Sequence, residues 1–301
     1  MRQNRLGNSD LYVSEVGLGC MSVGTDETKA VSIIQEAMEL GINFFDTADL
    51  YDYGRNEELL GKAIRHRRSD VIVATKVGNR QLPGKEERMW DPSKAYILSA
   101  VKESLRRLGT DYIDLYQLHG GTIEDPIEET IEAFEGLKQE GWIRYYGISS
   151  IRPNVIREYV RRSNITSLMG QYSMLDRRPE EEVLPQLMEH NIGFIARGPL
   201  AGGILTSGGV NKAERGYLDY SREELSAVRQ RLMELADDTR TPEQIAIRHV
   251  LSEPGVTVTL PGASSLEQLR SNVSAADTRL SADERDALLA VTRANRYSIH
   301  R

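Results

Sequence analysis

The chain has 301 residues, of which 40% are apolar, and its 38 basic and 45 acidic side chains give a formal net charge of −7. This balance argues against a general nucleic-acid binder, and the single cysteine, Cys20, excludes an internal disulfide. Since there is neither an apolar leader nor an apolar run of membrane-spanning length, we expect one cytoplasmic domain over 1–301 that acts on small molecules away from membranes.

The first predicted element is a β-hairpin, because Gly7-Asn8-Ser9-Asp10 supplies turn residues between MRQNRL and LYVSEV. Apolar runs and amphipathic helical segments then alternate. Continuous apolarity is typical of strands covered by helices, and eight strands are what a closed β/α barrel needs. The predicted fold is an α/β (β/α)8 TIM barrel, with strands at VGLG (16–19), NFFD (43–46), VIVAT (71–75), IDLYQLH (113–119), IRYYGIS (143–149), SLMGQ (167–171), IGFIA (192–196) and VTVTL (256–260).

Capping residues predict where several helices begin. Asp125 before Pro126, and Thr241 before Pro242 with Gln244 at the third helical position, indicate helix starts between strands. Two more capping boxes, at 221–224 and 281–284, lie outside the eightfold alternation and predict two additional helices. The connections 77–92 and 197–240 are long, and long connections in compact domains are often functional.

Four residues at or just after the ends of apolar runs suggest a catalytic site: Asp46, Tyr51, Lys76 and His119. The ends of successive barrel strands converge on one rim, so these residues can become neighbours in space. A nearby ammonium favours phenolate, so we expect Lys76 to lower the pKa of Tyr51 below its reference value of about 10.

Together with their surroundings, these residues resemble the aldo-keto reductase family over nearly the whole chain. The stretches that carry the resemblance are GLGCMSVG (17–24), GINFFDTADLYDYGRNEELLGKAI (41–64), VATKVG (73–78), DYIDLYQLH (111–119), GWIRYYGISS (141–150), GQYSMLD (170–176), GPLAGGIL (198–205) and PGASSLEQLRSN (261–272). The resemblance implies NAD(P)H-dependent reduction of an aldehyde or ketone. Tyr51 would be the general acid, Lys76 and Asp46 would tune it, and His119 would orient the substrate oxygen.

The chain has no GxGxxG fingerprint after a first strand, so a Rossmann domain is not expected. The resemblance instead implies a nicotinamide dinucleotide extended across the carboxyl rim, with its carboxamide held by Ser149 and Gln171. By the same resemblance the other cofactor-binding positions are Gly19, Cys20, Met21, Asp46, Arg197, Gly198, Pro199, Leu200, Gly202, Gly262, Ser264, Gln268 and Asn272.

The chain departs from the common family pattern at both ends of the cofactor. Ser150 stands where many members have asparagine, and Arg197 stands where many have a tyrosine stacked on the nicotinamide. Near the adenine end the usual cation is missing, so a 2′-phosphate would depend on the helix start at Ser264 and Ser265, with Arg270 as a distal partner. We expect NADPH, and NADH stays open.

The substrate-binding residues predicted on the rim are Met21, Tyr51, Trp90, His119 and Tyr217, although Trp90 could equally be a packing residue of the 77–92 connection. No metal site is predicted, and the oligomeric state is left open. Two other functions stay open: a nicotinamide-binding sensor resembling potassium-channel β subunits, and a Schiff-base enzyme in which a neutral Lys76 attacks a carbonyl.

Overall fold

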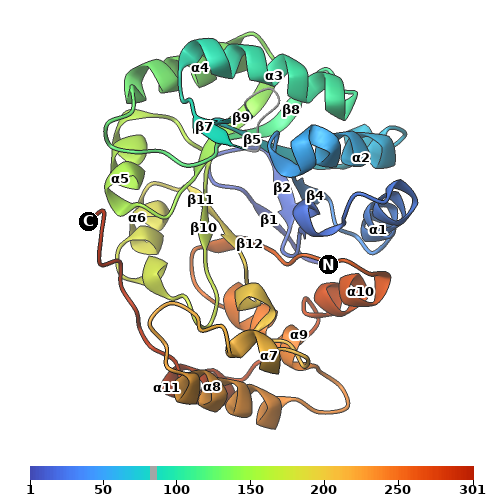
Figure 1. Ribbon diagram of the computed structural model, residues 1–301, viewed down its shortest axis with the longest axis vertical. Helices are drawn as coiled ribbons and strands as arrows, with labels where there is room; N and C mark the ends of the chain where they lie inside the picture. Colours follow the sequence, from blue (N-terminus) through green and yellow to red (C-terminus); the bar gives the residue numbers. More distant parts are fainter. Residues whose placement is uncertain (82–86) are drawn as a thin grey trace.

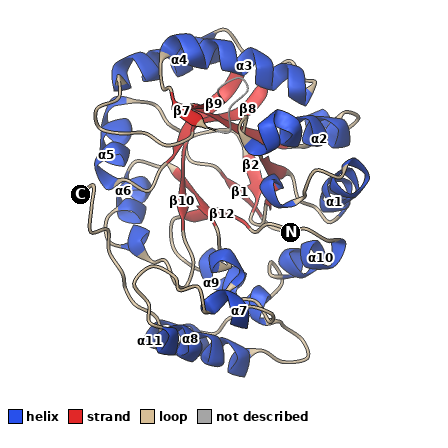
Figure 2. Cartoon of the chain, viewed as in Figure 1, coloured by secondary structure: helices blue, strands red, loops and turns tan. Residues whose placement is uncertain are grey.

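Parallel strands in the middle of the molecule are surrounded by helices (Figure 1, Figure 2). The computed structural model describes residues 1–81 and 87–301. Within these ranges eight strands pair in parallel in the order in which they occur in the chain. They are β3 (Leu18–Gly19), β4 (Phe44–Asp46), β5 (Ile72–Val77), β8 (Ile113–Leu118), β9 (Ile143–Ser149), β10 (Ser167–Gln171), β11 (Gly193–Arg197) and β12 (Val256–Leu260).

The sheet closes into a barrel between its first and last strands. Val16 forms a parallel bridge with Thr259, and the Gly17 N–H donates to the Thr259 carbonyl at 2.9 Å. The predicted (β/α)8 barrel is therefore confirmed. The main difference is at β5, which runs past its apolar run to Val77, because Lys76 pairs in register with Gln117 of β8.

One helix follows each barrel strand on the outside. These helices are α1 (Glu27–Glu39), α2 (Arg55–Ile64), α3 (Lys94–Leu108), α4 (Ile127–Gln139), α5 (Pro153–Arg162), α6 (Val183–Glu189), α9 (Pro242–Leu251) and α10 (Leu266–Ser274). Their apolar faces and the outer faces of the strands form one large core.

The two additional helices are α8 (Arg222–Leu235) and α11 (Ala282–Ala290), and both begin with the predicted capping box. They pack with α9 around a separate apolar cluster that includes Leu225, Leu232 and Leu288. A short helix that was not predicted, α7 (Val210–Ala213), precedes α8 in the 197–240 connection.

The N-terminal hairpin, β1 (Gln3–Arg5) and β2 (Tyr12–Ser14), lies at the end of the barrel where the strands begin. Its Leu6, Leu11 and Val13 are buried against interior residues of the strands, including Phe44 and Leu115. The hairpin thus seals this end with apolar side chains, and the open rim is the one where the strands end.

The 77–92 connection contains a second hairpin that the sequence did not predict, formed by β6 (Asn79–Gln81) and β7 (Arg88–Trp90). The part of the connection at 82–86 lies outside the described residues. The predicted cap of α4 was wrong, because the Asp125 carboxylate accepts hydrogen bonds from Thr122 and from the Trp90 indole N–H instead of capping the helix.

Candidate active site

The ends of β4, β5 and β8 bring the four predicted catalytic residues together. Asp46 is the last residue of β4, Lys76 the second-last of β5, and His119 directly follows β8. The Lys76 ammonium donates to Asp46 Oδ2 at 2.7 Å and to the Thr47 carbonyl at 2.7 Å, and both charged side chains are buried. A buried ion pair of this kind needs such additional hydrogen bonds to offset desolvation.

Tyr51 reaches the same place from the loop after β4. Its hydroxyl lies 3.4 Å from Lys76 Nζ, and the ammonium also lies 4.9 Å from the centre of the Tyr51 ring. The ring meets that of His119 edge to face, with 6.0 Å between ring centroids. A phenol, an ammonium, a carboxylate and an imidazole therefore share one half-buried place at the rim.

Burial decides whether the pKa of Tyr51 is raised or lowered. Desolvation raises the pKa of Tyr51 above its usual value, and the opposing effect of the Lys76 ammonium is smaller. The expectation that Lys76 would bring this pKa below 10 was wrong, because it weighed the charge and left out the desolvation. Burial lowers the pKa of Lys76, but Asp46 and Tyr51 more than offset it, so the net shift is upward. At neutral pH the pair is phenol and ammonium.

The His119 imidazole is neutral at physiological pH. Burial, followed by the positive charges of Lys76, Arg197 and Arg88, lowers the pKa of His119 to about 3. Its Nδ1 atom is buried, and among the described residues it has no hydrogen-bond partner. The backbone N–H of His119 donates to the Val77 carbonyl at 2.7 Å, which fixes the position of the residue at the end of β8. A neutral imidazole can donate one N–H to a substrate oxygen.

Sequence reasoning missed the buried polar residues that hold this cluster. Asn56 Nδ2 donates to the Cys20 carbonyl at 2.9 Å, and Asn56 Oδ1 accepts from the Thr47 hydroxyl at 2.7 Å. Gln117 Nε2 donates to Asp46 Oδ1 at 3.5 Å. Asn56 and Glu57 are both buried on the side of α2 that faces the barrel, and polar residues within an apolar stripe are the signal that could have revealed them.

The predicted carboxamide contacts lie at the ends of β9 and β10, the next two strands after β8 around the barrel. Ser149 ends β9 and is buried, whereas Gln171 ends β10 and is half-buried. Gln171 Nε2 donates to the Tyr217 hydroxyl at 3.3 Å, and Gln171 Oε1 accepts from the exposed Arg197 guanidinium. Tyr217 thus lies on the predicted cofactor side of the rim, in contact with Gln171.

Arg197 is the last residue of β11, and the loop that follows it contains Gly198, Pro199, Leu200 and Gly202. Gly198 has φ +70°, a left-handed conformation that favours glycine, and a Cβ there would lie 2.2 Å from Gln171 Nε2, so a larger residue would displace the Gln171 amide. Further along, the Arg229 guanidinium of α8 donates to the carbonyls of Ile204 and Thr206. α8, one of the two additional helices, therefore stabilises the loop that the family resemblance assigns to cofactor binding.

The predicted adenine end lies at the start of α10. Gln268 Oε1 accepts from the Ser264 N–H at 2.8 Å and from its hydroxyl at 3.0 Å, and Ser265 caps the helix. Asn272 is buried and donates to the Gly262 carbonyl at 3.1 Å. Arg270 donates to Glu36 of α1 at 2.9 and 2.8 Å in an exposed ion pair, and its role as a distal phosphate partner stays a prediction.

The end of β3 supplies Gly19, Cys20 and Met21. Cys20 is fully buried, burial raises the pKa of its thiol, and its carbonyl accepts from Asn56 Nδ2, so a contact with the cofactor stays a prediction. Met21 is 62% exposed, on the rim. Trp90 is half-buried and packs against Gly78 and Gly120, which flank the Lys76 and His119 segments. Its packing role is thus visible, and a substrate contact from it stays a prediction.

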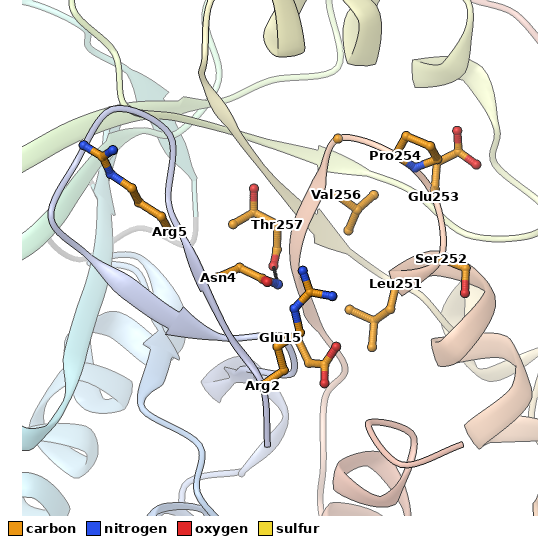
Figure 3. A pocket seen from close by; sticks show the side chains of 11 residues that line it. Arg2, Asn4, Arg5, Glu15, Leu251, Ser252, Glu253, Pro254, Val256 and Thr257 are labelled. Atoms are coloured by element: carbon orange, nitrogen blue, oxygen red, sulfur yellow. Dashed lines mark hydrogen bonds between the residues drawn. The ribbon is translucent and has the colours of Figure 1, made fainter. Parts of the chain in front are cut away.

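A polar cavity of about 340 Å³ lies at the opposite end of the barrel, between the hairpin and residues 251–257. Figure 3 shows the side chains that line it, including Arg2, Asn4 and Glu15. It shares no residue with the four-residue cluster. We place the candidate active site at the other rim because Tyr51, Lys76 and His119 meet there.

The fold is a (β/α)8 barrel with a cluster of ionisable side chains at one rim, and comparisons with known proteins show its family. The model of the Aldo/keto reductase family matches residues 15–292. The chain belongs to the aldo/keto reductase family, and is therefore an oxidoreductase. Among the described residues, no helix is long and apolar enough to cross a membrane.

Several relatives are similar over their full length. The chain is 59% identical to the uncharacterized oxidoreductase YqkF of Bacillus subtilis (strain 168), and the match covers 100% of both chains. It is 56% identical to the holo form of aldo-keto reductase AKR11C1 from Bacillus halodurans, with a TM-score of 0.94 and coverage of 100% and 99%. For the apo form of that protein the identity is 52%, the TM-score 0.85, and the coverage again 100% and 99%.

Proposed function

We propose that this protein reduces the carbonyl group of small aldehydes or ketones with NAD(P)H. The observation that carries the proposal is the contact of the Tyr51 hydroxyl with the buried Lys76–Asp46 pair, 3.4 Å from Lys76 Nζ, beside His119. The family, and the likeness to a relative solved in a holo form, support the use of a nicotinamide cofactor.

In the proposed reaction Tyr51 would donate its hydroxyl proton to the carbonyl oxygen. When bound, a reduced nicotinamide would supply the hydride that the carbonyl carbon accepts. The phenolate left on Tyr51 lies beside the Lys76 ammonium, which stabilises it. The neutral His119 imidazole donates an N–H to the same oxygen and orients it. Because burial raises the pKa of Tyr51, its acid form is present at neutral pH and is lost only in strongly alkaline solution.

The residues of the rim fit a nicotinamide dinucleotide. Gln171 presents an amide at the end of β10, Ser149 lies at the end of β9, and glycine at 198 leaves space beside Gln171. These groups would hold the carboxamide, while the loop from Arg197 to Gly202 and the start of α10 would hold the phosphates and adenosine.

NADPH is the first candidate cofactor, on the strength of the family resemblance, and NADH is the second. The arrangement at α10 reduces the expected preference, because Arg270 is engaged with Glu36 and the Ser264 N–H with Gln268. A 2′-phosphate would have to displace the Gln268 side chain. Titration of intrinsic tryptophan fluorescence with each cofactor, followed by turnover with the tighter one, measures the preference directly.

The proposal is tested by Tyr51→Phe with a panel of aldehydes, following the loss of reduced cofactor. We expect the rate to fall about 10²–10⁴-fold, the usual contribution of a general acid, while the Kd of the cofactor changes less than about threefold. Tyr53→Phe is the matched control, because Tyr53 lies two residues away and is 68% exposed. Full activity in Tyr51→Phe would refute the role of Tyr51.

The two alternative functions, a Schiff-base enzyme and a nicotinamide-binding sensor, predict different properties. A Schiff-base mechanism needs a neutral lysine, whereas the Asp46 carboxylate 2.7 Å from Lys76 Nζ favours the ammonium. A nicotinamide-binding sensor would bind the cofactor tightly and fail to turn over any aldehyde of the panel. Borohydride trapping of a substrate on Lys76 would favour the first alternative, and cofactor binding without turnover the second.

A further inference from the structure

The turn that follows Tyr51 has an unfavourable backbone. Asp52 and Tyr53 have φ values of +48° and +56°, and Gly54 has +86°, so three successive residues are left-handed. For residues other than glycine this conformation costs about 1–2 kcal/mol each. Such a turn persists only when the surrounding structure stabilises it. The residue directly before the turn is Tyr51, the proposed general acid.

The Arg107 side chain, from the last turn of α3, lies against this turn. A Cβ placed on Gly54 would be 2.6 Å from Arg107 Cδ and 2.8 Å from Arg107 Nε, so the backbone of Gly54 rests directly on the arginine. Arg107 Nε donates to Glu57 Oε2 at 2.6 Å, and its Nη2 donates to the Ser104 hydroxyl at 3.3 Å. The arginine therefore cannot swing away from the turn without breaking bonds.

Glu57 links the contact between Arg107 and Gly54 to β5, the strand that carries Lys76. Its side chain is fully buried in the first turn of α2, and its Oε1 accepts from the Thr75 hydroxyl at 2.6 Å. Thr75 immediately precedes Lys76 on β5. One carboxylate thus joins the support of the Tyr51 turn to the strand that carries the cation paired with Tyr51.

Close packing of α2 against α3 makes this connection rigid. A Cβ on Gly61 of α2 would lie 2.3 Å from the Leu108 carbonyl, so the two helices can approach this closely only because position 61 is glycine. The helices lie side by side in Figure 1. Gly61 is one helical turn after Glu57, and Leu108 is the residue after Arg107, so the contact fixes the ion pair between the helices.

We propose that Arg107 is a positioning residue for the reaction: through Glu57 and its contact with Gly54 it holds the left-handed turn, and so keeps the Tyr51 hydroxyl beside Lys76. This inference rests on the proposed function, because it gives Tyr51 the role of acid. A displacement of about 1 Å in a reacting group can slow a reaction about 10²-fold. The arginine itself touches neither substrate nor cofactor in this role.

The first experiment compares Arg107→Met, which keeps the aliphatic stem and removes the guanidinium, with Arg106→Met. Arg106 is the matched control, because its partner is the exposed Glu103 and it does not touch the turn. We expect Arg107→Met to lower kcat about 10–100-fold per cofactor-binding site, with KM and cofactor Kd within about threefold of wild type. A larger primary isotope effect with deuterated NADPH should accompany the loss, and Arg107→Lys should recover part of it.

A merely structural role would give a different result. Loss of folded protein alone leaves kcat per cofactor-binding site and the isotope effect unchanged, and that outcome would overturn the proposal. If Arg107→Met fails to fold because Glu57 is left as an uncompensated buried charge, the double variant Glu57→Gln/Arg107→Met removes that charge. We expect the same loss of kcat in the double variant, and wild-type kcat there would also overturn the proposal.

A readout that needs no substrate separates this proposal from the proposed function. With tyrosines labelled by ¹³C at Cζ, the Tyr51 signal is identified by its absence in Tyr51→Phe. Arg107→Met should move this signal toward that of an exposed tyrosine, and Arg106→Met should not. An unchanged signal in Arg107→Met would overturn the positioning role, whereas a shifted signal in an enzyme that reduces no carbonyl would refute only the proposed reaction.

Discussion

The two halves of the rim that carries the candidate active site are built differently. On the side of β4, β5 and β8, charged groups are buried and satisfy one another, as in the Asp46–Lys76 pair. On the side of β9 to β12 and α10, polar groups that could face a cofactor are bonded to other protein side chains nearer the surface, as Gln171 is to Arg197 and Ser264 is to Gln268.

This difference indicates how each half would work. The first half is organised before any ligand arrives, so its geometry is fixed by the ends of rigid strands. The second half would exchange protein hydrogen bonds for bonds to the cofactor, and such exchanges change free energy little for each bond. Substitutions in the first half should therefore have large effects, and substitutions in the second half small ones.

We expect Lys76→Met to have the largest effect. It is also the strictest test of the difference between the two halves of the rim. It leaves Asp46 as an uncompensated buried charge, which typically costs about 3–5 kcal/mol of unfolding free energy. It also removes the cation beside Tyr51, so we expect a rate loss of about 10²-fold or more. Urea unfolding and cofactor-dependent turnover measure the two effects.

The double variant Asp46→Asn/Lys76→Met is the control for that experiment, because it removes both charges of the pair. It should recover most of the stability and none of the rate. A double variant that regained activity would show that the ion pair serves only the fold.

An intermediate effect is expected at Asp49, in the same half of the rim. Burial, followed by the nearby Glu57 charge, raises the pKa of Asp49 to about 7. In the unfolded chain this group ionises near 3.9, so its contribution to stability is present below about pH 4 and is lost as the pH rises through 7. Because one pKa unit corresponds to about 1.4 kcal/mol, Asp49→Asn should stabilise the protein by roughly 4 kcal/mol at pH 8 and by about 1.5 kcal/mol at pH 5. Thermal unfolding at both pH values measures this, and an equal gain at each would contradict the titration of Asp49.

The smallest expected effect is that of Arg270→Ala, in the second half. Because the guanidinium is engaged with Glu36, its removal should change the ratio of NADPH to NADH affinity by less than about twofold. A tenfold loss of NADPH affinity alone, about 1.4 kcal/mol, would mean that Arg270 leaves Glu36 to bind the 2′-phosphate. Fluorescence titrations with both cofactors distinguish the outcomes.

Local patterns were enough to predict the architecture. The order of the eight strands and the capping boxes of α8 and α11 were visible, because apolar runs and caps depend on neighbouring residues. The β6–β7 hairpin was missed, since its segment lacks a strong apolar alternation. Asp125 was misassigned as a cap because its pairing with Trp90 joins residues 35 positions apart.

By itself, the sequence determined the barrel, the hairpin that closes one end, and which side chains follow the strands. Only the tertiary structure decided what state those side chains are in: that burial outweighs Lys76 in setting the pKa of Tyr51, that His119 is neutral, and that Arg270 binds Glu36. The physical reason is that desolvation and pairing depend on distances between groups far apart in the chain, and local patterns carry no record of those distances.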